Sequence, residues 1–203
     1  MEIRKIGEPL ELAIERVVRV SIDGISFDLE CTPTNLDDLI LGFLVTQGFR
    51  EVKVEDAKIS ISEALPEPAK KVTAKEKYSI KELKNALKYL EVEEYKRTRG
   101  YHIAAIVDKN GLVARAYDVS RHSAVDKVVG MCVRKKVPLS KTFLLFSGRI
   151  SRGIVLKCIR AGIPLVTSKA AILDSAIELC RKTGLSAVSF ATNIAVIGDA
   201  LEI

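Results

Sequence analysis

The chain has 203 residues, of which 48% are apolar and 29% are charged, and its formal net charge is +6 at pH 7. This length is typical of one domain of ~200 residues or of two small ones, and the composition excludes collagen-like, disordered and membrane-spanning proteins. Because no apolar stretch typical of a signal peptide follows Met1, we expect a cytoplasmic protein that does not bind a membrane.

Residues 1–62 are predicted to form a β-hairpin followed by a helix. Apolar and polar residues alternate on both sides of Asp23-Gly24, a pattern typical of two antiparallel strands joined by a type I′ turn. The apolar positions are Val18, Val20 and Ile22 before the turn and Ile25, Phe27 and Leu29 after it. A helix is expected from about residue 34 to Gly48, and apolar residues between 52 and 61 suggest another short antiparallel pair.

Residues 63–78 contain two prolines and many charged side chains, and they are predicted to form a linker. Beyond it, residues 79–203 are expected to form an α/β portion. This portion begins with a helix that starts at Ser79-Ile80-Lys81-Glu82, a sequence with the form of a capping box. An extended hairpin over residues 102–117 and a helix over residues 123–135 follow.

From residue 142, predicted strands and helices alternate at short intervals. Strands are expected over residues 142–147, 163–167 and 187–190, and helices over residues 151–161 and 170–183. This order is typical of a parallel or mixed sheet with helices on both faces. Such sheets bind ligands at the carboxyl ends of their strands, so we expect a site where these strands end.

Positive charge is concentrated in one interval of the sequence. No Asp or Glu lies between Asp126 and Asp174, yet ten Lys or Arg residues do. These cations either form solvated helix faces that pair with carboxylates elsewhere in the fold, or surround an anion such as phosphate. Aromatic residues make up only 5% of the chain and Trp is absent, which argues against a nucleic-acid partner.

Three polar segments are candidates for the site. Residues 117–127 lead from a strand into a helix, where His122 and Asp126 could share one face, so that the carboxylate could orient the imidazole or raise its pKa. Ser147-Gly148-Arg149 lies at another strand-to-helix joint and offers backbone amides and a guanidinium to a phosphate. The third segment, Thr98-Arg99-Gly100-Tyr101-His102, precedes a strand. Ligand binding, catalysis or a structural hydrogen bond would each explain the two histidines.

No metal site is expected, because two histidines and scattered cysteines lack the close ligand pairs of zinc sites. A serine nucleophile elbow of the form Gly-x-Ser-x-Gly is also absent. The four cysteines lie far apart in apolar segments and are interpreted as buried, reduced thiols. They are Cys31, Cys132, Cys158 and Cys180.

Taken together, these segments resemble the formate dehydrogenase accessory protein family (FdhD/NarQ) over nearly the whole chain. The motifs that carry the resemblance are Glu8-Pro9-Leu10, "PTNLDDLILGFLVTQG" from Pro33, "DVSRHSAVDK" from Asp118, "SGR" from Ser147, Lys157, and the last strand around Phe190. The resemblance implies a cytidine-deaminase-like α/β fold, with the whole chain as one family unit, and a homodimer. It does not imply deamination, because the chain lacks the His-x-Glu and Pro-Cys-x-x-Cys motifs that hold zinc in deaminases.

The resemblance also implies a site for the molybdenum bis-guanine-dinucleotide cofactor, or for a GDP-like nucleotide. The protein would then support the maturation of a formate dehydrogenase or another molybdoenzyme. The implied cofactor-binding residues are His102, Asp118, Arg121, His122, Asp126, Lys127, Ser147, Gly148, Arg149, Phe190, Ala191, Thr192 and Asn193.

The chain departs from the family at the loop that carries sulfur. Family members have a Cys-x-x-Cys loop in which a cysteine accepts sulfur as a persulfide, whereas the corresponding stretch, Glu63 to Lys77, contains no cysteine. Arg99 also stands where the family commonly has glycine. We therefore favour an accessory protein that binds the cofactor without transferring sulfur through the usual cysteine.

Two alternatives stay open. The first is a sulfurtransferase that uses Cys31, or a thiol of a partner, and receives sulfur from a cysteine desulfurase. The second is an unrelated nucleotide enzyme in which His122 acts as a general acid or base.

Overall fold

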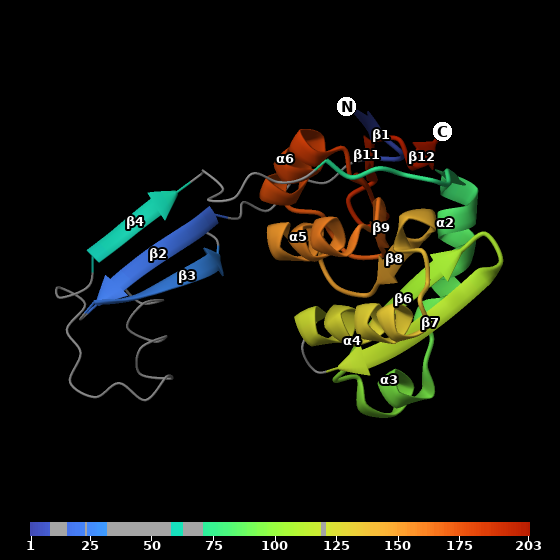
Figure 1. Cartoon of the computed structure of the whole chain (residues 1–203), viewed down its shortest axis with the longest axis horizontal. Helices are drawn as coiled ribbons and strands as arrows, with labels where there is room; N and C mark the ends of the chain where they lie inside the picture. The colour runs from blue at the N-terminus through green and yellow to red at the C-terminus, as the bar shows by residue number, and fades with distance from the viewer. Residues whose placement is uncertain (9–15, 23, 32–57, 63–70, 119–120) are drawn as a thin grey trace. The chain divides into compact units, whose positions relative to one another are not determined.

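The computed structural model describes residues 1–8, 16–22, 24–31, 58–62, 71–118 and 121–203. The chain divides into two compact units, one of Met1–Leu12 with Ala69–Ile203 and one of Ala13–Pro68 (Figure 1). Residues 1–12 thus group with the C-terminal portion and not with the predicted N-terminal one. The expected helix from residue 34 to Gly48 and most of the predicted linker lie outside the described residues.

The smaller unit contains an antiparallel sheet with the strand order β3-β2-β4. β2 (Arg16–Ile22) and β3 (Ile25–Cys31) form the predicted hairpin, and β4 (Lys58–Ser62) pairs with the other edge of β2. The residues predicted to share a face are cross-strand partners, Val18 with Leu29 and Val20 with Phe27. Val18 and Val20 are fully buried, which explains the alternation seen in the sequence.

The larger unit is built on a seven-stranded mixed sheet with the order β1-β11-β10-β9-β8-β6-β7. Its three central strands, β8 (Phe143–Phe146), β9 (Leu165–Ser168) and β10 (Ser186–Ser189), are parallel. The hairpin of β6 (His102–Asp108) and β7 (Gly111–Asp118) joins β8 through antiparallel pairing of β6. On the other side, β11 (Ile194–Ile197) pairs with β10, and β1 (Glu2–Lys5) pairs with β11.

Helices cover both faces of this sheet (Figure 1). On one face, α4 (Arg121–Arg134) contacts β6 and β7, α5 (Arg152–Ala161) contacts β9, and α6 (Asp174–Thr183) contacts β10 and β11. On the other face lie α2 (Ile80–Ala86), η2 (Leu87–Leu90) and α3 (Glu93–Thr98), whose buried and half-buried side chains join one apolar cluster. The predicted fold class, a mixed α/β sheet with helices on both faces, is therefore confirmed.

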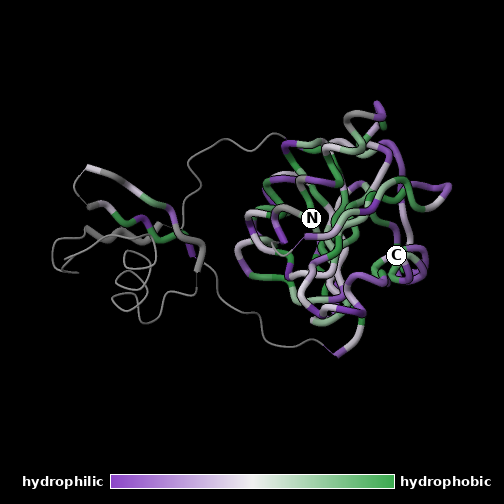
Figure 2. Tube along the Cα trace, turned by 90° about the horizontal axis from the view of Figure 1, so that it is seen from below, coloured by the Kyte–Doolittle hydropathy of each residue, from purple (hydrophilic) through white to green (hydrophobic). Residues whose placement is uncertain are grey.

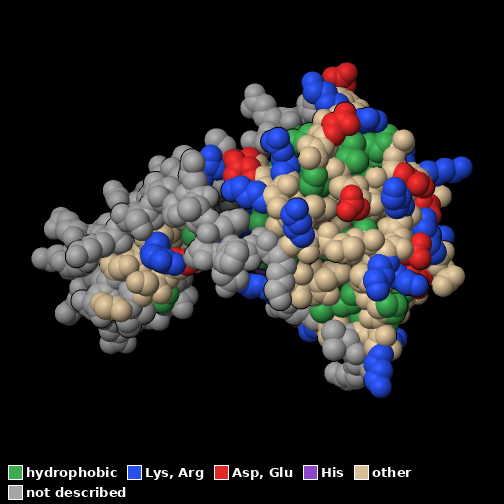
Figure 3. Space-filling view, turned by 45° about the horizontal axis from the view of Figure 1, so that its top comes forward, with side chains coloured by type: hydrophobic (Ala, Val, Ile, Leu, Met, Phe, Trp, Pro, Cys, Tyr) green, Lys and Arg blue, Asp and Glu red, His purple; other side chains and the backbone are tan. Residues whose placement is uncertain are grey.

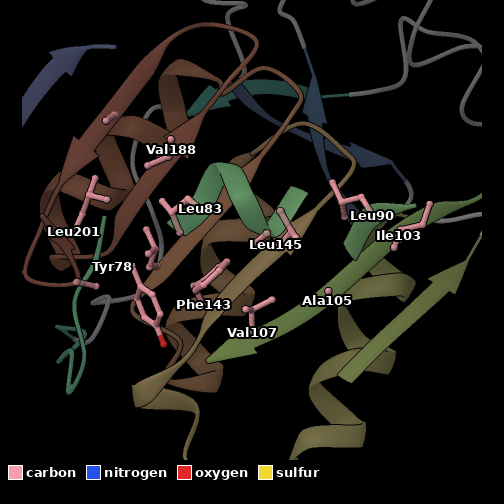
Figure 4. Close-up of a cluster of buried hydrophobic side chains, with 14 of the residues drawn as sticks. Tyr78, Leu83, Leu90, Ile103, Ala105, Val107, Phe143, Leu145, Val188 and Leu201 are labelled. Atoms are coloured by element: carbon pink, nitrogen blue, oxygen red, sulfur yellow. The ribbon is translucent and has the colours of Figure 1, made fainter. Parts of the chain in front are cut away.

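That apolar cluster is the core between the sheet and α2 (Figure 4). The rings of Tyr78 and Phe143 meet edge to face, with centroids 4.8 Å apart, and the Tyr78 hydroxyl donates to the Lys141 carbonyl at 2.5 Å. Leu83 of α2 and Leu145 of β8 are fully buried beside them. Figure 2 shows hydrophobic stretches of the larger unit mainly in its interior and hydrophilic stretches mainly at its outer turns.

The helix ends predicted from the sequence lie close to those in the structure, except at the start of α6. The capping box is present, because Ser79 Oγ accepts from the Glu82 amide and Glu82 Oε2 accepts from the Ser79 amide at 2.7 Å. α6 begins at Asp174, so the predicted start at residue 170 is wrong. The backbone of Ile150 donates to Ala171 and accepts from Leu173, and this pairing keeps residues 171–173 extended.

Two short strands complete the larger unit. β12 (Leu201–Glu202) pairs in parallel with β5 (Tyr78–Ser79), which directly precedes α2. None of the helices in the described residues is long and apolar enough to cross a bilayer.

Candidate functional site

The predicted polar segments meet at one edge of the seven-stranded sheet. The strand directions place the carboxyl ends of β7, β8, β9 and β10 at this edge, where the antiparallel strand β6 begins. His102 starts β6 and is the cross-strand partner of Asp118, which ends β7. Ser147-Gly148-Arg149 follows β8 and Phe190–Asn193 follows β10. The sheet topology thus explains why segments distant in the sequence lie together.

Arg121 lies at the centre of this edge, at the first residue of α4. Its side chain packs on Gly148, because a Cβ placed at Gly148 would lie 3.4 Å from both Cβ and Cδ of Arg121. Burial and then the charge of Arg121 lower the pKa of His102 below its usual value of 6.5. Three elements therefore bring Arg121, Gly148 and His102 into one cluster.

The guanidinium of Arg121 has unused hydrogen-bonding capacity. Its Nε is buried and has no hydrogen-bond partner in the described part of the chain. Leaving a buried donor unpaired destabilises a protein by about 1–3 kcal/mol. Arg121 also stands at the positive end of the α4 dipole, and the first turn of this helix contains no acidic residue. An anion bound at this position would supply the missing acceptor.

The loop after β8 is held rigidly beside Arg121. The Ser147 amide donates to the Ile103 carbonyl, and Ser147 Oγ accepts from the Ile103 amide, each at 2.9 Å. Ser168 Oγ, at the end of β9, donates to the Gly148 carbonyl at 2.6 Å. Ser147 and Gly148 are thus fixed by the neighbouring strands, while Arg149 is exposed at the loop tip.

Asp118 and Lys127, two predicted site residues, are partners of each other. Lys127 Nζ lies 2.5 Å from Asp118 Oδ2 and donates to the Tyr117 carbonyl at 3.4 Å. This ion pair ties the end of β7 to α4. His122 is half-buried beside Arg121, and the side chain of Asp126 lies outside the described residues, so the pairing of His122 with Asp126 stays a prediction.

Of the four residues that follow β10, two hold the backbone turn and the other two are accessible to a ligand. Thr192 is buried and donates through Oγ1 to Ser189 Oγ at 2.7 Å, and Asn193 Nδ2 donates to the Glu8 carbonyl at 2.8 Å. These two residues hold the turn into β11. Phe190 is half-buried and Ala191 is exposed, so they are the members of this segment that a ligand would touch.

Sequence reasoning included Arg99 in the third polar segment but missed Tyr95 and Lys169, which lie beside it at the same edge. The ring centroid of Tyr95 in α3 lies 5.5 Å from Arg99 Cζ and 5.8 Å from Lys169 Nζ. Lys169 belongs to the interval without acidic residues, which was the only signal for it in the sequence. No signal pointed to Tyr95.

Three of the four cysteines are confirmed as buried free thiols, namely Cys132, Cys158 and Cys180. Burial raises the pKa of each, and that of Cys158 to about 12, so these thiols are scarcely ionised at neutral pH. The backbone of Cys31 ends β3 in the smaller unit, and its side chain lies outside the described residues.

The part of the chain that the structure describes contains no group of three or more His, Cys, Asp or Glu side chains that could hold a metal ion.

The histidine pKa gives a direct check of the cluster. The chain has only two histidines, so their imidazole protons can be followed separately by NMR. We expect the midpoint of His102 to lie below 6.5 and to rise when Arg121 is replaced by alanine, because both burial and the cation disfavour protonation. Since the folded pKa is the lower one, protonation of His102 destabilises the fold as the pH falls from about 6.5 toward that pKa. An unchanged midpoint in Arg121→Ala would contradict the contact.

Gly148 gives a second check. In Gly148→Ala the new methyl group would lie 2.9 Å from Phe146 Cε2 and against the Arg121 side chain. We expect Arg121 to be displaced and the free energy of unfolding to fall by about 1–3 kcal/mol. Urea unfolding measures the loss, and Gly100→Ala is the control because its nearest neighbour is an ordinary 3.7 Å away. Equal stability of the two variants would show that Gly148 is not tightly packed.

The fold and the site define an α/β protein with a cationic cluster at the carboxyl edge of its sheet. A sequence model of the FdhD/NarQ family matches residues 56–197. The chain is also 30% identical over 235 residues to the sulfur carrier protein FdhD of Shouchella clausii, with 92% of this chain and 88% of that protein covered. The chain therefore belongs to the FdhD/NarQ family, as its motifs predicted.

Two further comparisons agree with this assignment. The sulfur carrier protein FdhD of Bacillus licheniformis is 26% identical over 224 residues, which cover 90% of this chain and 85% of that protein. Among solved structures, a candidate formate dehydrogenase accessory protein from Desulfotalea psychrophila matches with a TM-score of 0.57. The match covers 90% of this chain and 94% of the other at 22% sequence identity, and it supports the fold.

Proposed function

We propose that this protein binds the guanine-nucleotide part of the molybdenum bis-guanine-dinucleotide cofactor, and that it acts as an accessory protein for a formate dehydrogenase or another molybdoenzyme. The observation that carries the proposal is the buried Arg121 Nε without a partner, set beside Gly148 and His102 at the start of α4. Relatives named sulfur carrier protein FdhD support the accessory role.

Arg121 and Arg149 would hold the phosphates of the nucleotide. A guanidinium forms charge-assisted hydrogen bonds with phosphate oxygens, often two at a time. Gly148 has no side chain, which allows the Arg121 side chain to pack directly on it, beside the exposed Arg149. The amides at the start of α4 add donors and the positive end of a helix dipole.

His102 would contribute a neutral hydrogen-bond donor. Because burial and then Arg121 lower its pKa, the neutral form of the imidazole is favoured in the free protein. A phosphate bound beside Arg121 would offset that cation and raise the pKa again. Binding at pH 7 would therefore be accompanied by partial proton uptake at His102.

Phe190 and Ala191 would contact the base. They follow β10, next to the strand whose end carries Ser168, and the Phe190 amide donates to the Ser168 carbonyl at 3.0 Å. A half-buried aromatic ring at the rim of a site is suited to stack on a nucleobase. In this arrangement the ligand lies across the ends of β8, β9 and β10.

A titration of the folded, full-length protein with guanine nucleotides tests the proposal. We expect calorimetry to show that GDP binds more tightly than GMP, and GMP more tightly than guanosine, because each phosphate adds contacts to cations. If guanosine bound as tightly as GDP, the phosphates would contribute nothing to binding, which would contradict the proposed phosphate site. The absence of GDP binding at millimolar concentration would contradict the proposal as a whole.

A second candidate function is sulfur transfer, favoured by the name that the relatives carry. The buried thiols Cys132, Cys158 and Cys180 are poor acceptors because their pKa values are raised. If this chain carries sulfur, Cys31 is its acceptor, or the thiol belongs to a partner. The Cys31 thiolate would attack the sulfane sulfur of a cysteine desulfurase persulfide, forming a persulfide on Cys31 and releasing the thiol of the desulfurase.

Mass spectrometry after incubation with a cysteine desulfurase and free cysteine tests this second function. Addition of one sulfur atom at Cys31, absent in Cys31→Ser, would establish it. An unmodified Cys31 under conditions that load a control acceptor would exclude it.

We also propose that the protein is a homodimer. We expect sedimentation of the full-length protein to give twice the mass of one chain.

A further inference from the structure

A second group of cations lies at the same edge of the sheet, on the face opposite α4. It consists of Arg99, the C-cap residue of α3, and Lys169, which follows β9, both placed around the ring of Tyr95. Tyr95 packs against the apolar cluster that includes Ile103 and Leu145, on the side of the sheet that α2 covers. Tyr95, Arg99 and Lys169 are distinct from Arg121 and Arg149, which are proposed above to hold the nucleotide phosphates.

The backbone of Arg99 adopts a conformation that is uncommon for its residue type. Its φ is +54°, in the left-handed region, and its amide donates to the Tyr95 carbonyl at 2.7 Å to close the helix. Glycine is the residue that fits such a C-cap without strain. An arginine in a strained conformation is consistent with a use for its side chain.

The two cations contact one aromatic ring, and neither has a counter-ion among the described residues. Among the residues that the structure describes, Arg99 and Lys169 contact the Tyr95 ring and form no ion pair with a carboxylate. The neighbouring carboxylate of Glu93 is occupied by Lys96, at 2.7 Å. The Tyr95 ring orients both cations through its negative faces and leaves their net charge in place.

A buried hydroxyl on the same face adds an independent observation. Thr167 is fully buried, and its Oγ1 has no hydrogen-bond partner in the described residues. Its cross-strand partners, Leu145 and Val188, both belong to the apolar cluster on which Tyr95 packs. Lys169 follows β9 directly, and its Nζ lies on this face, 5.8 Å from the Tyr95 ring centroid. A buried hydroxyl without a partner and the two cations therefore lie on the same side of the sheet.

We propose that Tyr95, Arg99 and Lys169 form a second anion subsite, which binds a phosphate group. If the proposed function holds, this phosphate group belongs to the same cofactor as the phosphates proposed to lie at Arg121. The cofactor would then contact both faces of the sheet at this edge. Only the identity of the ligand rests on the proposed function. The subsite itself is tested with an inorganic probe.

The test is an NMR titration of the full-length protein with inorganic pyrophosphate, at about 0.1 M salt to screen charges farther than about 10 Å away. We expect saturable shifts of the Arg99, Gly100 and Lys169 amides. Arg99→Gly and Lys169→Gln should each weaken this binding by about 10-fold, because each removes one charge-assisted contact. Arg97→Ala removes an exposed cation of the same helix and should change it by less than about 2-fold.

Arg99→Gly keeps the experiment clear of folding defects, since glycine suits the left-handed cap. Equal affinity of the wild type, Arg99→Gly and Lys169→Gln for pyrophosphate, or shifts without saturation, would overturn the second subsite. In Arg121→Ala the shifts at Lys169 should persist. The second subsite can therefore be established even if GDP does not bind. Loss of binding at the Arg121 cluster alone is distinguished from loss of the second subsite, because the pyrophosphate shifts at Lys169 then persist.

Discussion

Replacing Arg121 with alanine is expected to weaken GDP binding by about 100-fold, the loss that corresponds to a paired guanidinium–phosphate contact of about 3 kcal/mol. Its Nε is buried without a partner in the described residues of the free protein, so the substitution also removes an unsatisfied donor. We therefore expect the free energy of unfolding to change by no more than about 1 kcal/mol. Calorimetric titration and urea unfolding of the same preparation measure the two quantities.

Two variants control for charge and for location. Arg121→Lys keeps the charge and loses the planar fork, so it should bind GDP about 10-fold less tightly than the wild type. Arg181→Ala removes an exposed cation from the last turn of α6 and should bind as the wild type does. Wild-type affinity in Arg121→Ala would show that the guanidinium does not hold the ligand.

Replacing Gly198 with alanine is expected to have the largest effect on stability. The added methyl group would lie 2.3 Å from the Gly184 carbonyl oxygen, 2.8 Å from Met1 Cε and 3.0 Å from Ser186 Oγ. The carbonyl belongs to the residue that caps α6 at a φ of +82°, so it cannot move aside without disturbing the helix end. We expect the free energy of unfolding to fall by about 3 kcal/mol or more.

Gly130→Ala is the matched control for this prediction. Gly130 lies within α4, and a Cβ there meets no described atom within 4 Å. Alanine favours the helix over glycine by about 1 kcal/mol, so this variant should be slightly more stable than the wild type. Urea midpoints of the two variants should thus move in opposite directions. A Gly198→Ala protein as stable as Gly130→Ala would contradict the close packing at β11.

Local signals in the sequence predicted much of the larger unit. The hairpin of β6 and β7 followed from two extended runs on either side of a turn that contains Gly111, whose φ is +117°. α5 and α6 end at Gly162 and Gly184, which take the left-handed conformation that marks helix ends. Each of these features is decided by residues that are close in the sequence, so one sequence is sufficient to find it.

Features that depend on distant pairing could not be predicted. β1 is short and exposed, and it is a strand only because it pairs with β11 at the other end of the chain. α3 begins at Glu93, and its N-cap residue Val92 makes no side-chain cap, so the start of the helix carries no signal. The approach of Lys169 to Tyr95 depends on where β9 and α3 lie in the sheet, which periodicity does not reveal.

The basic interval has a mixed explanation in the structure. Arg149 and Lys169 stand at the sheet edge, as an anion site requires, whereas Lys127 pairs with Asp118 and Arg160 lies in the last turn of α5. On the face seen in Figure 3, Lys and Arg side chains alternate with Asp and Glu. The interpretation as surface charge is thus confirmed for Lys127, whereas the interpretation as an anion site stays a prediction for the cations at the sheet edge.

The central claim is that the Arg121 cluster holds a nucleotide phosphate, and a crystal structure of the full-length protein with GDP tests it most directly. We predict a phosphate oxygen about 2.7–2.9 Å from Arg121 Nε, the distance typical of a charge-assisted hydrogen bond. The phosphate should lie against Gly148, with the base toward Phe190. GDP bound away from the ends of β8 and β10, with Arg121 Nε still unpaired, would contradict the account.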